Sequence, residues 1–497
     1  MKKPLASSLL LSLLIFNLVS LQPCLAYSHQ SAVKNVIILI GDGMGVAHVE
    51  ITKLVYGHLN MEDFPVTGLE LTDSLSGEVT DSAAAGTAIA TGVKTYNGMI
   101  SVTNVTGRIT NVTTLLEVAQ TLGKSTGLVT TTRITHATPA VFASHVPDRD
   151  MEDEIARQLI LHRVNVLLGG GKKEFDEDTL KMAEDYGYNI VFTKEELEKS
   201  EGDFILGLFA DSHIPYVLDR EPGDVGLLDM TKKAISVLER NPNGFFLMVE
   251  GGRIDHAAHE NDIGSVVAET KEFDDVVGYI LEYARKRGDT LVIVLADHET
   301  GGLAIGLTYG NSVNEKAIKG IKASASRIAS EIKVTGDIRG IFKKYADFEP
   351  TIEEIAYIKK TLNSTDRYAL QNAVVEIINR RVGVGFVSHK HTGAPVPLLA
   401  YGPGSENFGG FLHHVDTAKL IAKLMLFGRE NTPITISGVS GIKGDITGDS
   451  EVDRRDAYIT LMMLLGENVD NEAEKRVDMD RNGMIDLKDV LLILQES

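Results

Sequence analysis

The run Val36-Ile37-Ile38-Leu39-Ile40 is followed directly by Gly41-Asp42-Gly43-Met44-Gly45. An unbroken apolar run is typical of a parallel β-strand that is buried on both faces. The glycines allow a sharp turn after the strand, and Asp42 lies at its carboxyl end, where open α/β sheets place their binding sites. The sequence therefore predicts an α/β fold with a functional carboxylate at the end of its first strand.

The same pattern occurs twice more along the chain. Phe245-Phe246-Leu247-Met248-Val249 ends in Glu250, and Leu291-Val292-Ile293-Val294-Leu295 is followed by Ala296-Asp297-His298. A single acid at a strand end is usually a helix cap or a turn residue. Three acids at the ends of buried strands repel one another unless cations hold them together. The repeated pattern therefore predicts a metal centre.

Asp81-Ser82-Ala83-Ala84-Ala85-Gly86-Thr87-Ala88 places a hydroxyl where a helix should begin, because the alanine run is a strong helix former. Serine is a favoured N-cap residue, and the free N–H groups of a first helical turn attract anions. Ser82 is therefore a candidate to cap the helix, to receive a phosphoryl group, or to do both. Taken alone, the stretch favours the capping role.

Further candidate ligands are acidic and imidazole side chains in two later segments. Asp255 and His259 are four residues apart, so they share one face of a helix. This spacing suits zinc, and it equally suits an exposed ion pair. His389 and His391 precede an apolar run, where a lone histidine is more often structural. These residues gain weight only in combination with the strand-end acids.

The remaining stretches are helical or loop-like. Residues 135–140 and 147–149 are rich in Thr and Pro and are predicted to be loops, and Arg149 offers a planar fork for a phosphate. Charged helical stretches are predicted at residues 151–162, 194–200 and 351–362. Residues 312–380 carry no metal-like cluster and are expected to form an insertion or a second lobe.

The bulk composition excludes some functions. The chain has 497 residues and a formal net charge of −20, with 43% hydrophobic and 24% charged residues. This length allows a large core and more than one domain. The negative charge argues against nucleic-acid binding, because phosphate backbones are bound by dense Lys and Arg. A small anionic substrate then requires a locally positive site, which metal ions supply.

Residues 1–26 have the pattern of a cleavable export signal, with a positively charged start, an apolar run at 9–21 and a cleavage site at Cys24-Leu25-Ala26. A lipoprotein cysteine at Cys24 is the alternative, and Pro23 disfavours it. Cleavage after Ala26 removes the single cysteine, so no disulfide is expected. We expect a secreted, cell-surface or periplasmic protein.

The C-terminal part has a different character. Residues 431–443 are predicted to be a linker, and residues 444–497 a small calcium-binding unit. Two Asp-rich loops follow the 1, 3, 5, 9, 12 ligand spacing of a calcium loop, and each precedes a helix-like run. The candidate calcium ligands are Asp445, Thr447, Asp449, Asp453 and Asp456 in the first loop, and Asp478, Asp480, Asn482, Asp486 and Asp489 in the second.

Five motifs of the chain resemble those of the alkaline phosphatase family and occur in the same order. They lie at residues 41–45, 81–88, 249–255, 296–302 and 391–393, and the resemblance covers about residues 35–430. The catalytic domain is then expected at residues 27–430. The last unit resembles a dockerin, the calcium-binding module that docks onto cohesin domains. The resemblance implies a three-layer α/β/α fold with a central, mostly parallel sheet, and a small all-α module. It also implies a homodimer, a cohesin-bearing partner and hydrolysis of phosphate monoesters through a phosphoserine.

The resemblance gives each candidate residue a role. Ser82 becomes the nucleophile, and Arg149 holds the phosphate. Two Zn²⁺ and one Mg²⁺ are implied, with the first zinc at Asp255, His259 and His391, the second at Asp42, Asp297 and His298, and the magnesium at Asp42, Thr138 and Glu250, with His136 also among the metal residues. His391 is preferred to His389 because Thr-Gly follows it.

The chain departs from these patterns at four positions. The best-known bacterial phosphatase of this family has Asp and Lys where this chain has His136 and His256, although other members carry His at both, so the third ion stays open. Thr447 and Ser450 replace the usual Asn or Asp and Gly of the first calcium loop, which predicts weaker calcium binding there.

Three alternative functions are weighed against the phosphatase. A phosphodiesterase or sulfatase uses the same scaffold, although Ser82 lacks the sequence context of a sulfatase. A non-catalytic surface protein requires lost metal ligands, and all are present. A calcium-binding adhesion protein explains only the last 55 or so residues.

Overall fold

The structure is a computed structural model, and it describes residues 33–77, 79–105, 107–306, 312–428, 442–466 and 476–496. The predicted export signal at 1–26 lies outside the described residues, as does most of the predicted linker at 431–443. Among the helices of the described ranges, none combines the length and the hydrophobicity needed to span a bilayer.

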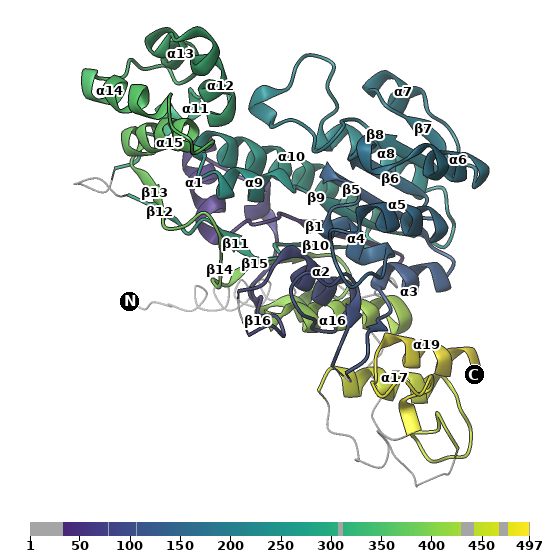
Figure 1. Ribbon diagram of the computed structural model, residues 1–497. Coiled ribbons are helices and arrows are strands. Elements are labelled where there is room, and N and C mark those ends of the chain that lie inside the picture. The colour runs from purple at the N-terminus through teal and green to yellow at the C-terminus, as the bar shows by residue number, and fades with distance from the viewer. Residues whose placement is uncertain are drawn as a thin grey trace, which may run out of the picture. The chain divides into compact units, whose positions relative to one another are not determined.

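A ten-stranded sheet forms the centre of the fold (Figure 1), with the strand order β16-β2-β15-β10-β1-β9-β5-β6-β8-β7. Only β15 runs antiparallel to its neighbours; the other strand pairs are parallel. The strands are β1 Asn35–Ile40, β2 Val66–Leu71, β5 Ser125–Arg133, β6 Val166–Gly170, β7 Asn189–Val191, β8 Ile205–Leu208, β9 Phe245–Glu250, β10 Thr290–Leu295, β15 Val396–Tyr401 and β16 Gly410–His413. The predicted mostly parallel sheet is confirmed.

Helices cover both faces of this sheet (Figure 1). One face carries α2 Ser82–Thr91, α3 Leu115–Thr121, α4 Ala137–Ala143, α5 Glu152–Leu161, α6 Glu177–Asp185 and α16 His414–Phe427. The other carries α8 Leu227–Leu238, α9 Arg253–His259 and α10 Ile263–Arg287, and α7 Lys194–Lys199 adjoins α8. The three-layer arrangement follows from this division.

The central strand β1 shows why the layers form. Its residues are all buried, and successive side chains point to opposite faces. Ile38 and Ile40 pack into the cluster with α2, α4 and α16, whereas Ile37 and Leu39 pack into the cluster with α8 and α10. A strand that is apolar at every position can therefore satisfy two helical layers at once.

Residues 312–382 form a helical lobe with its own apolar cluster, which also includes α1 Val46–Tyr56. Its helices are α11 Glu315–Lys319, α12 Ala325–Thr335, α13 Ile338–Tyr345, α14 Ile352–Thr361 and α15 Ala369–Val382. Short two-stranded sheets join β11 Glu299–Thr300 to β14 His391–Thr392, β12 Leu303–Ile305 to β13 Val384–Phe386, and β3 Val102–Thr103 to β4 Thr110–Asn111. The 3₁₀ helices cover Asn60–Asp63, Lys172–Glu174, Val217–Asp219 and Ser405–Phe408.

Two helices, α17 Arg454–Leu464 and α19 Leu487–Glu496, pack together in the described part of the C-terminal unit. The helix predictions at 151–162, 194–200 and 351–362 correspond to α5, α7 and α14. The loop prediction at 135–140 is wrong, because α4 begins at Ala137. Pro139 lies in the first turn of α4, where a helix tolerates proline because the missing N–H needs no partner there.

Candidate active site

The three strand-end acids meet at one edge of the sheet. Asp42 follows β1, Glu250 ends β9 and Asp297 follows β10, and these strands are neighbours in the order β10-β1-β9. Ile40 is in register with both Glu250 and Leu295. Parallel strands in register end at one level, so the three carboxylates lie close together, and all three are fully buried.

Ser82 is the first residue of α2, not its N-cap. Asp81 takes the capping role, since its Oδ1 accepts the backbone N–H of Ala84 at 2.9 Å. The capping role that the sequence favoured for Ser82 is therefore wrong. The Ser82 hydroxyl does not cap the helix, and its Oγ lies 3.2 Å from Nε2 of the buried His298. The Ser82 hydroxyl therefore lies at the positive end of a helix.

His298 connects Ser82 to the strand-end acids. Its Nε2 lies 3.2 Å from Oδ2 of Asp297 and 3.7 Å from Oδ1 of Asp42. Neither oxygen of Asp42 accepts a hydrogen bond from the described residues, although both are buried. Orphaned buried carboxylate oxygens are costly unless a cation binds them. Asp42, Asp297 and His298 therefore fit a divalent cation beside Ser82.

A second group forms around Asp255 and two histidines. Oδ1 of Asp255 lies 3.4 Å from Nε2 of His259 and 3.6 Å from Nε2 of His391, and these two nitrogens are 3.0 Å apart. Nδ1 of His259 faces the carbonyl of His389, and Nδ1 of His391 faces that of Thr80. Carbonyls only accept, so in the neutral rings both protons are on Nδ1 and the two bare nitrogens face each other. A cation between them would resolve this repulsion.

The two groups adjoin, since the rings of His298 and His391 stack with centroids 3.5 Å apart. His389, the alternative in the sequence, instead bonds through Nδ1 to the carbonyl of His259. The preference for His391 is consistent with this geometry. Thr300, which the sequence did not single out, donates its hydroxyl to Oδ1 of Asp255.

The third group contains Asp42, His136 and Glu250, with Thr138 nearby in the first turn of α4. Oε2 of Glu250 accepts the hydroxyls of Thr130 and Thr132, whereas its Oε1 and the Thr138 hydroxyl have no hydrogen-bond partner among the described residues. These unpaired oxygens fit a hard cation such as Mg²⁺.

Arg149 lies between the helix that carries Ser82 and the third group. Its Nη1 donates to Oδ2 of Asp81 at 3.1 Å, and its Nη2 contacts Nε2 of His136 at 3.1 Å. A guanidinium only donates, so Nε2 of His136 accepts and the ring proton is on Nδ1. Asp81 thus both caps α2 and orients Arg149, a role that the sequence analysis missed.

Burial shifts the pKa values of two acids and two imidazoles of the site. Burial raises the pKa of Asp42 well above its ordinary value, and the charges of Asp297, Asp255 and Glu250 raise it further. Burial also raises the pKa of Glu250 to about 7. Burial lowers the pKa values of His298 and His136, so both rings are neutral.

A fully buried ion pair between His414 and Glu70 contacts the backbone of Asp297. His414 at the start of α16 places Nδ1 3.1 Å from Oε2 of Glu70, and its Nε2 bonds the backbone carbonyl of Asp297 at 2.9 Å. Glu70 in β2 also accepts the hydroxyl of Thr417. No sequence signal could pair Glu70 with His414, because 344 residues separate them.

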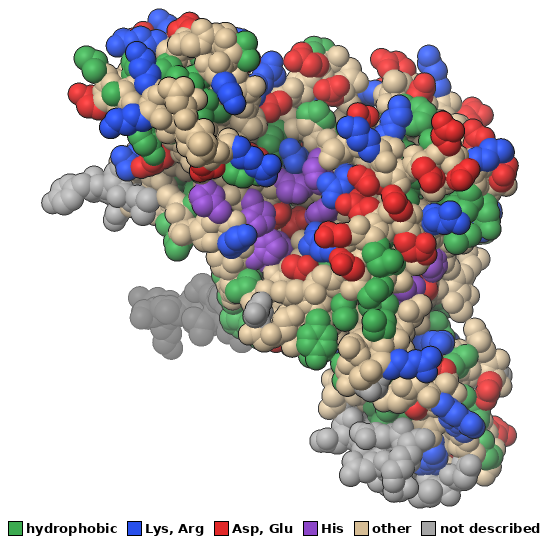
Figure 2. Space-filling view, viewed as in Figure 1, with side chains coloured by type: hydrophobic (Ala, Val, Ile, Leu, Met, Phe, Trp, Pro, Cys, Tyr) green, Lys and Arg blue, Asp and Glu red, His purple; other side chains and the backbone are tan. Residues whose placement is uncertain are grey.

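Histidine side chains gather in a hollow on the face shown in Figure 2. The adjacent cavity has a volume of about 460 Å³. Arg253, His256 and His259 line one wall of it, and residues before and within α15, including Tyr368 and Gln371, line the other. The helical lobe therefore contributes a wall next to a candidate metal ligand.

The candidate calcium ligands behave differently in the two loops. In the second, Asp478, Asp480 and Asp489 place oxygens within 4.8 Å of one another, whereas the N–H of Asn482 donates to both Asp478 and Asp480 and Asp486 accepts the N–H of Lys488. In the first loop the described residues give no such group. There Asp456 accepts the N–H groups of Ile446, Thr447 and Asp453, Asp445 accepts those of Gly448 and Ser450, Asp449 accepts that of Glu451, and Asp453 caps α17.

Comparison with known proteins gives a consistent result. The family model described as "Alkaline phosphatase" matches residues 33–427. The chain is 37% identical over 419 residues to "Alkaline phosphatase 4" of Bacillus subtilis (strain 168), covering 80% of this chain and 90% of that protein. The crystal structure of a cold-active alkaline phosphatase from a psychrophilic Shewanella sp. aligns with a TM-score of 0.75 and 32% identity, covering 79% of this chain and 99% of that one.

A third relative bears on metal binding. The alkaline phosphatase of the Antarctic bacterium TAB5 has been solved as a histidine-to-aspartate variant with Mg bound in what is called its M3 site. It aligns with a TM-score of 0.61 and 28% identity, over 80% of this chain and 99% of that chain. The fold, the family model and the curated relatives agree, so the chain belongs to the alkaline phosphatase family and is a hydrolase of phosphate monoesters.

Proposed function

We propose that Ser82 is the nucleophile of this phosphatase and that the reaction passes through a phosphoserine. The observation that supports this most directly is the position of the Ser82 Oγ. It lies at the start of α2, 3.2 Å from Nε2 of His298. Serine is a weak nucleophile at neutral pH, and a helix terminus contributes only up to ~2 kcal/mol. The barrier for phosphate monoesters is far larger, so further activation is required.

We propose that metal ions supply this activation. Asp255, His259 and His391 would hold one zinc, Asp42, Asp297 and His298 a second, and Asp42, Glu250 and Thr138 the third ion, beside His136. The orphaned oxygens of Asp42 and the facing nitrogens of His259 and His391 support this assignment. When bound, such ions lower the pKa of a coordinated hydroxyl and stabilise a leaving oxygen.

The side chains of the protein then perform the remaining steps. The Ser82 oxygen forms a bond to phosphorus as the bond to the alcohol breaks, and the alcohol leaves with a proton. Water next attacks the phosphoserine and releases inorganic phosphate and the free Ser82 hydroxyl. Arg149 and the first N–H groups of α2 hold the non-bridging oxygens through both steps. Asp81 keeps Arg149 at the end of α2.

The test is hydrolysis of a chromogenic phosphate monoester at alkaline pH by the full chain, before and after chelation. We expect chelation to abolish turnover and zinc plus magnesium to restore it, with a matched phosphodiester turned over far more slowly. Turnover that survives complete metal removal would contradict the metal assignment, and faster diester hydrolysis would favour the phosphodiesterase alternative.

His136→Asp is expected to increase magnesium binding and activation by Mg²⁺. A ring nitrogen of His136 lies near the carboxylates of Asp42 and Glu250, but its Nε2 accepts from Arg149 and its Nδ1 carries the ring proton, so the neutral ring offers the ion no free lone pair. Mg²⁺ prefers oxygen ligands, so a carboxylate here completes a harder site. Isothermal titration with Mg²⁺ and activity at rising Mg²⁺ measure the change, for which we expect at least a tenfold gain in affinity, about 1.4 kcal/mol.

His213→Asp is the matched control for this prediction. The His213 ring lies 5.7 Å from that of His136, and burial together with Arg253 lowers its pKa to about 3. It belongs to none of the groups around Ser82, so the same change in charge should not improve magnesium binding. Equal gains in the two variants would show that general electrostatics, rather than ligation, is responsible.

We further propose that the C-terminal unit is a calcium-binding, dockerin-like module that attaches the phosphatase to a cohesin-bearing partner. The packing of α17 on α19 and the convergence of Asp478, Asp480 and Asp489 support this.

We expect Asp478→Ala to weaken calcium binding more than Asp445→Ala, because only the second loop gathers three carboxylates among the described residues. Calcium titration of the full chain measures this, and the reverse order would contradict the proposal. The homodimer stays a prediction of the resemblance.

A further inference from the structure

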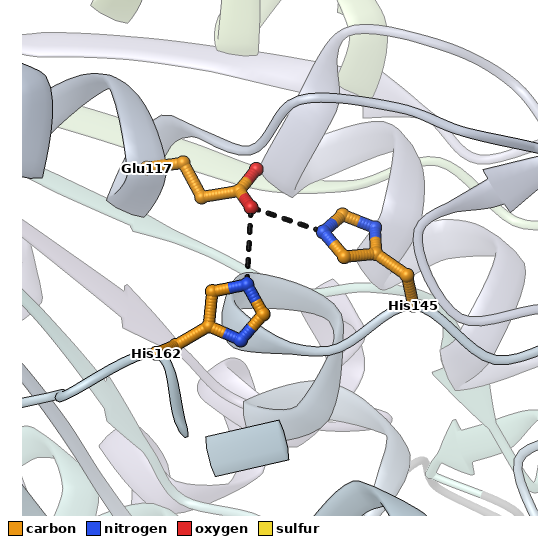
Figure 3. A group of neighbouring side chains, drawn as sticks. All are labelled: Glu117, His145 and His162. Carbon is orange, nitrogen blue, oxygen red and sulfur yellow. Dashed lines mark hydrogen bonds and ion pairs between the residues drawn. The ribbon is translucent and has the colours of Figure 1, made fainter. Parts of the chain in front are cut away.

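Three side chains outside the phosphatase site converge on one point (Figure 3). Glu117 lies in α3, His145 lies two residues after α4, and His162 is the C-cap of α5. Oε1 of Glu117 is 3.1 Å from Nε2 of His145 and 3.2 Å from Nε2 of His162. None of the three belongs to the groups around Ser82.

The other ring nitrogens of the two histidines determine what Nε2 can do. Nδ1 of His145 lies 2.8 Å from the carbonyl oxygen of Ser101, and Nδ1 of His162 lies 3.0 Å from that of Gln158. A carbonyl only accepts, so each neutral ring carries its proton on Nδ1. Two bare nitrogens then face one carboxylate oxygen. This arrangement is repulsive unless extra protons or a cation lie between the three atoms.

The geometry is compatible with a metal ion between the three side chains. Metal-binding histidines typically donate their second ring N–H to a backbone carbonyl, as both do here. Tetrahedral zinc at about 2.0–2.2 Å from its ligands separates ligand atoms by about 3.3–3.6 Å, slightly more than the observed 3.1 and 3.2 Å. Two histidines and one glutamate form a known zinc donor set that leaves a fourth position for water.

We propose that Glu117, His145 and His162 form a separate metal site that binds one zinc ion. The site is open on one side, since the side chains of Glu117 and His162 are 24% and 25% exposed, whereas His145 is 8% exposed. Imidazole nitrogens suit zinc, and a site of this composition disfavours Ca²⁺ and Mg²⁺, which prefer oxygen ligands.

The backbone around the site is fixed without a metal. Oε1 of Gln158 accepts the N–H of His145 at 2.7 Å, and the amide of Gln120 donates to the carbonyl of His162 at 2.7 Å. Oε2 of Glu117 accepts the N–H of Thr114 in the capping box of α3, which leaves Oε1 directed at the histidines. The three ligands are therefore already held in place, and little ordering is needed when the ion binds.

Bound zinc would support the phosphatase site structurally. Ser101, whose carbonyl receives His145, donates its N–H to the Thr87 hydroxyl of α2, the helix that begins with Ser82. The segment after His145 pairs Val146 with Ile100 and ends at Arg149, whose N–H bonds the carbonyl of Gly98. The ion would thus join α3 and α5 to the segment that carries Arg149.

The direct test is an anomalous difference map at the zinc edge, from crystals of the full chain equilibrated with micromolar zinc. We expect a peak between Glu117, His145 and His162 in addition to any peaks near Ser82. Absence of the peak, or a peak only at millimolar zinc, overturns the proposal. This readout does not depend on turnover, so a failure of the proposed phosphatase mechanism would be seen separately.

Variants give a second measurement. Glu117→Gln keeps the acceptor for the α3 cap, and His162→Ala removes a partly exposed ligand; each should lower bound zinc by one equivalent per chain, with kcat changed less than threefold. His58→Gln is the matched control, because His58 also lies within 3.5 Å of two acids, Glu62 and Asp63, but its side chain is 64% exposed. Asp42→Asn should instead remove ions near Ser82 and keep this one. Zinc content unchanged in both ligand variants argues against the site.

Discussion

Ser82→Ala is expected to lower kcat for a phosphate monoester by on the order of 10⁴- to 10⁶-fold, as loss of a covalent nucleophile does in other hydrolases. This corresponds to about 5 to 8 kcal/mol of transition-state stabilisation. The helix should be unaffected, because Asp81 rather than Ser82 caps α2. Steady-state kinetics with a chromogenic monoester measure the loss.

Two controls separate chemistry from folding. Bound zinc should be unchanged in Ser82→Ala, because the candidate ligands are acids and histidines elsewhere in the chain. Ser200→Ala is the matched variant, since Ser200 is also buried but its hydroxyl only donates to the carbonyl of Leu197 in α7. It should keep full activity. If Ser82→Ala retained near-normal rates with normal metal content, the phosphoserine route would be wrong.

Asp42→Asn is expected to abolish turnover. It should also make the protein less stable than wild type when metal is bound and more stable than wild type when metal is absent. Asp42 belongs to two of the candidate metal groups. Loss even of a residue that only orients a ligand costs about 10- to 100-fold in metal affinity or activity, so a shared ligand should cost more, on the order of 10³-fold. With metal present, the variant should therefore unfold at a lower temperature than wild type.

Without metal, the order should reverse. Burial and the charges of Asp297, Asp255 and Glu250 raise the pKa of Asp42. A carboxyl whose pKa rises on folding binds more protons in the folded state, so the stability of the metal-free protein falls as pH rises from about 4 towards that higher pKa. The neutral amide introduced by Asp42→Asn would carry no such penalty, so the chelated variant should be the more stable protein at pH 8. Thermal unfolding with and without chelator, between pH 5 and 9, measures both signs. A variant that is less stable than wild type under every condition would contradict the repulsion account.

The parts of the fold with strong local signals could be predicted from the sequence. β1, β9 and β10 are apolar at nearly every position. This one pattern predicted that the three segments are strands, that they are buried on both faces, and that the site lies at their carboxyl ends. The loop prediction at 135–140 failed because Thr and Pro suggested a turn, whereas Pro139 lies within the first turn of α4, where it is tolerated. Local composition could not decide between these outcomes.

The candidate site was predictable where residue type alone indicates a candidate ligand, and not where a role depends on distant partners. Asp42, Asp297 and His298 stood out at strand ends. Asp81 was passed over in favour of its neighbour Ser82, although aspartate caps helices equally well. The ion pair of Glu70 with His414 joins strands and helices that only the folded chain brings together, so no periodicity reveals it.

Two parts of the chain line the cavity beside His259. The candidate catalytic and metal residues named above come from the ends of β1, β9 and β10 and from α2, whereas Tyr368 and Gln371 come from the helical lobe. On the proposed function, we expect replacements in that lobe to alter which alcohols are accepted without moving any candidate catalytic residue. Substrate range and catalytic power can evolve on separate stretches of the same gene.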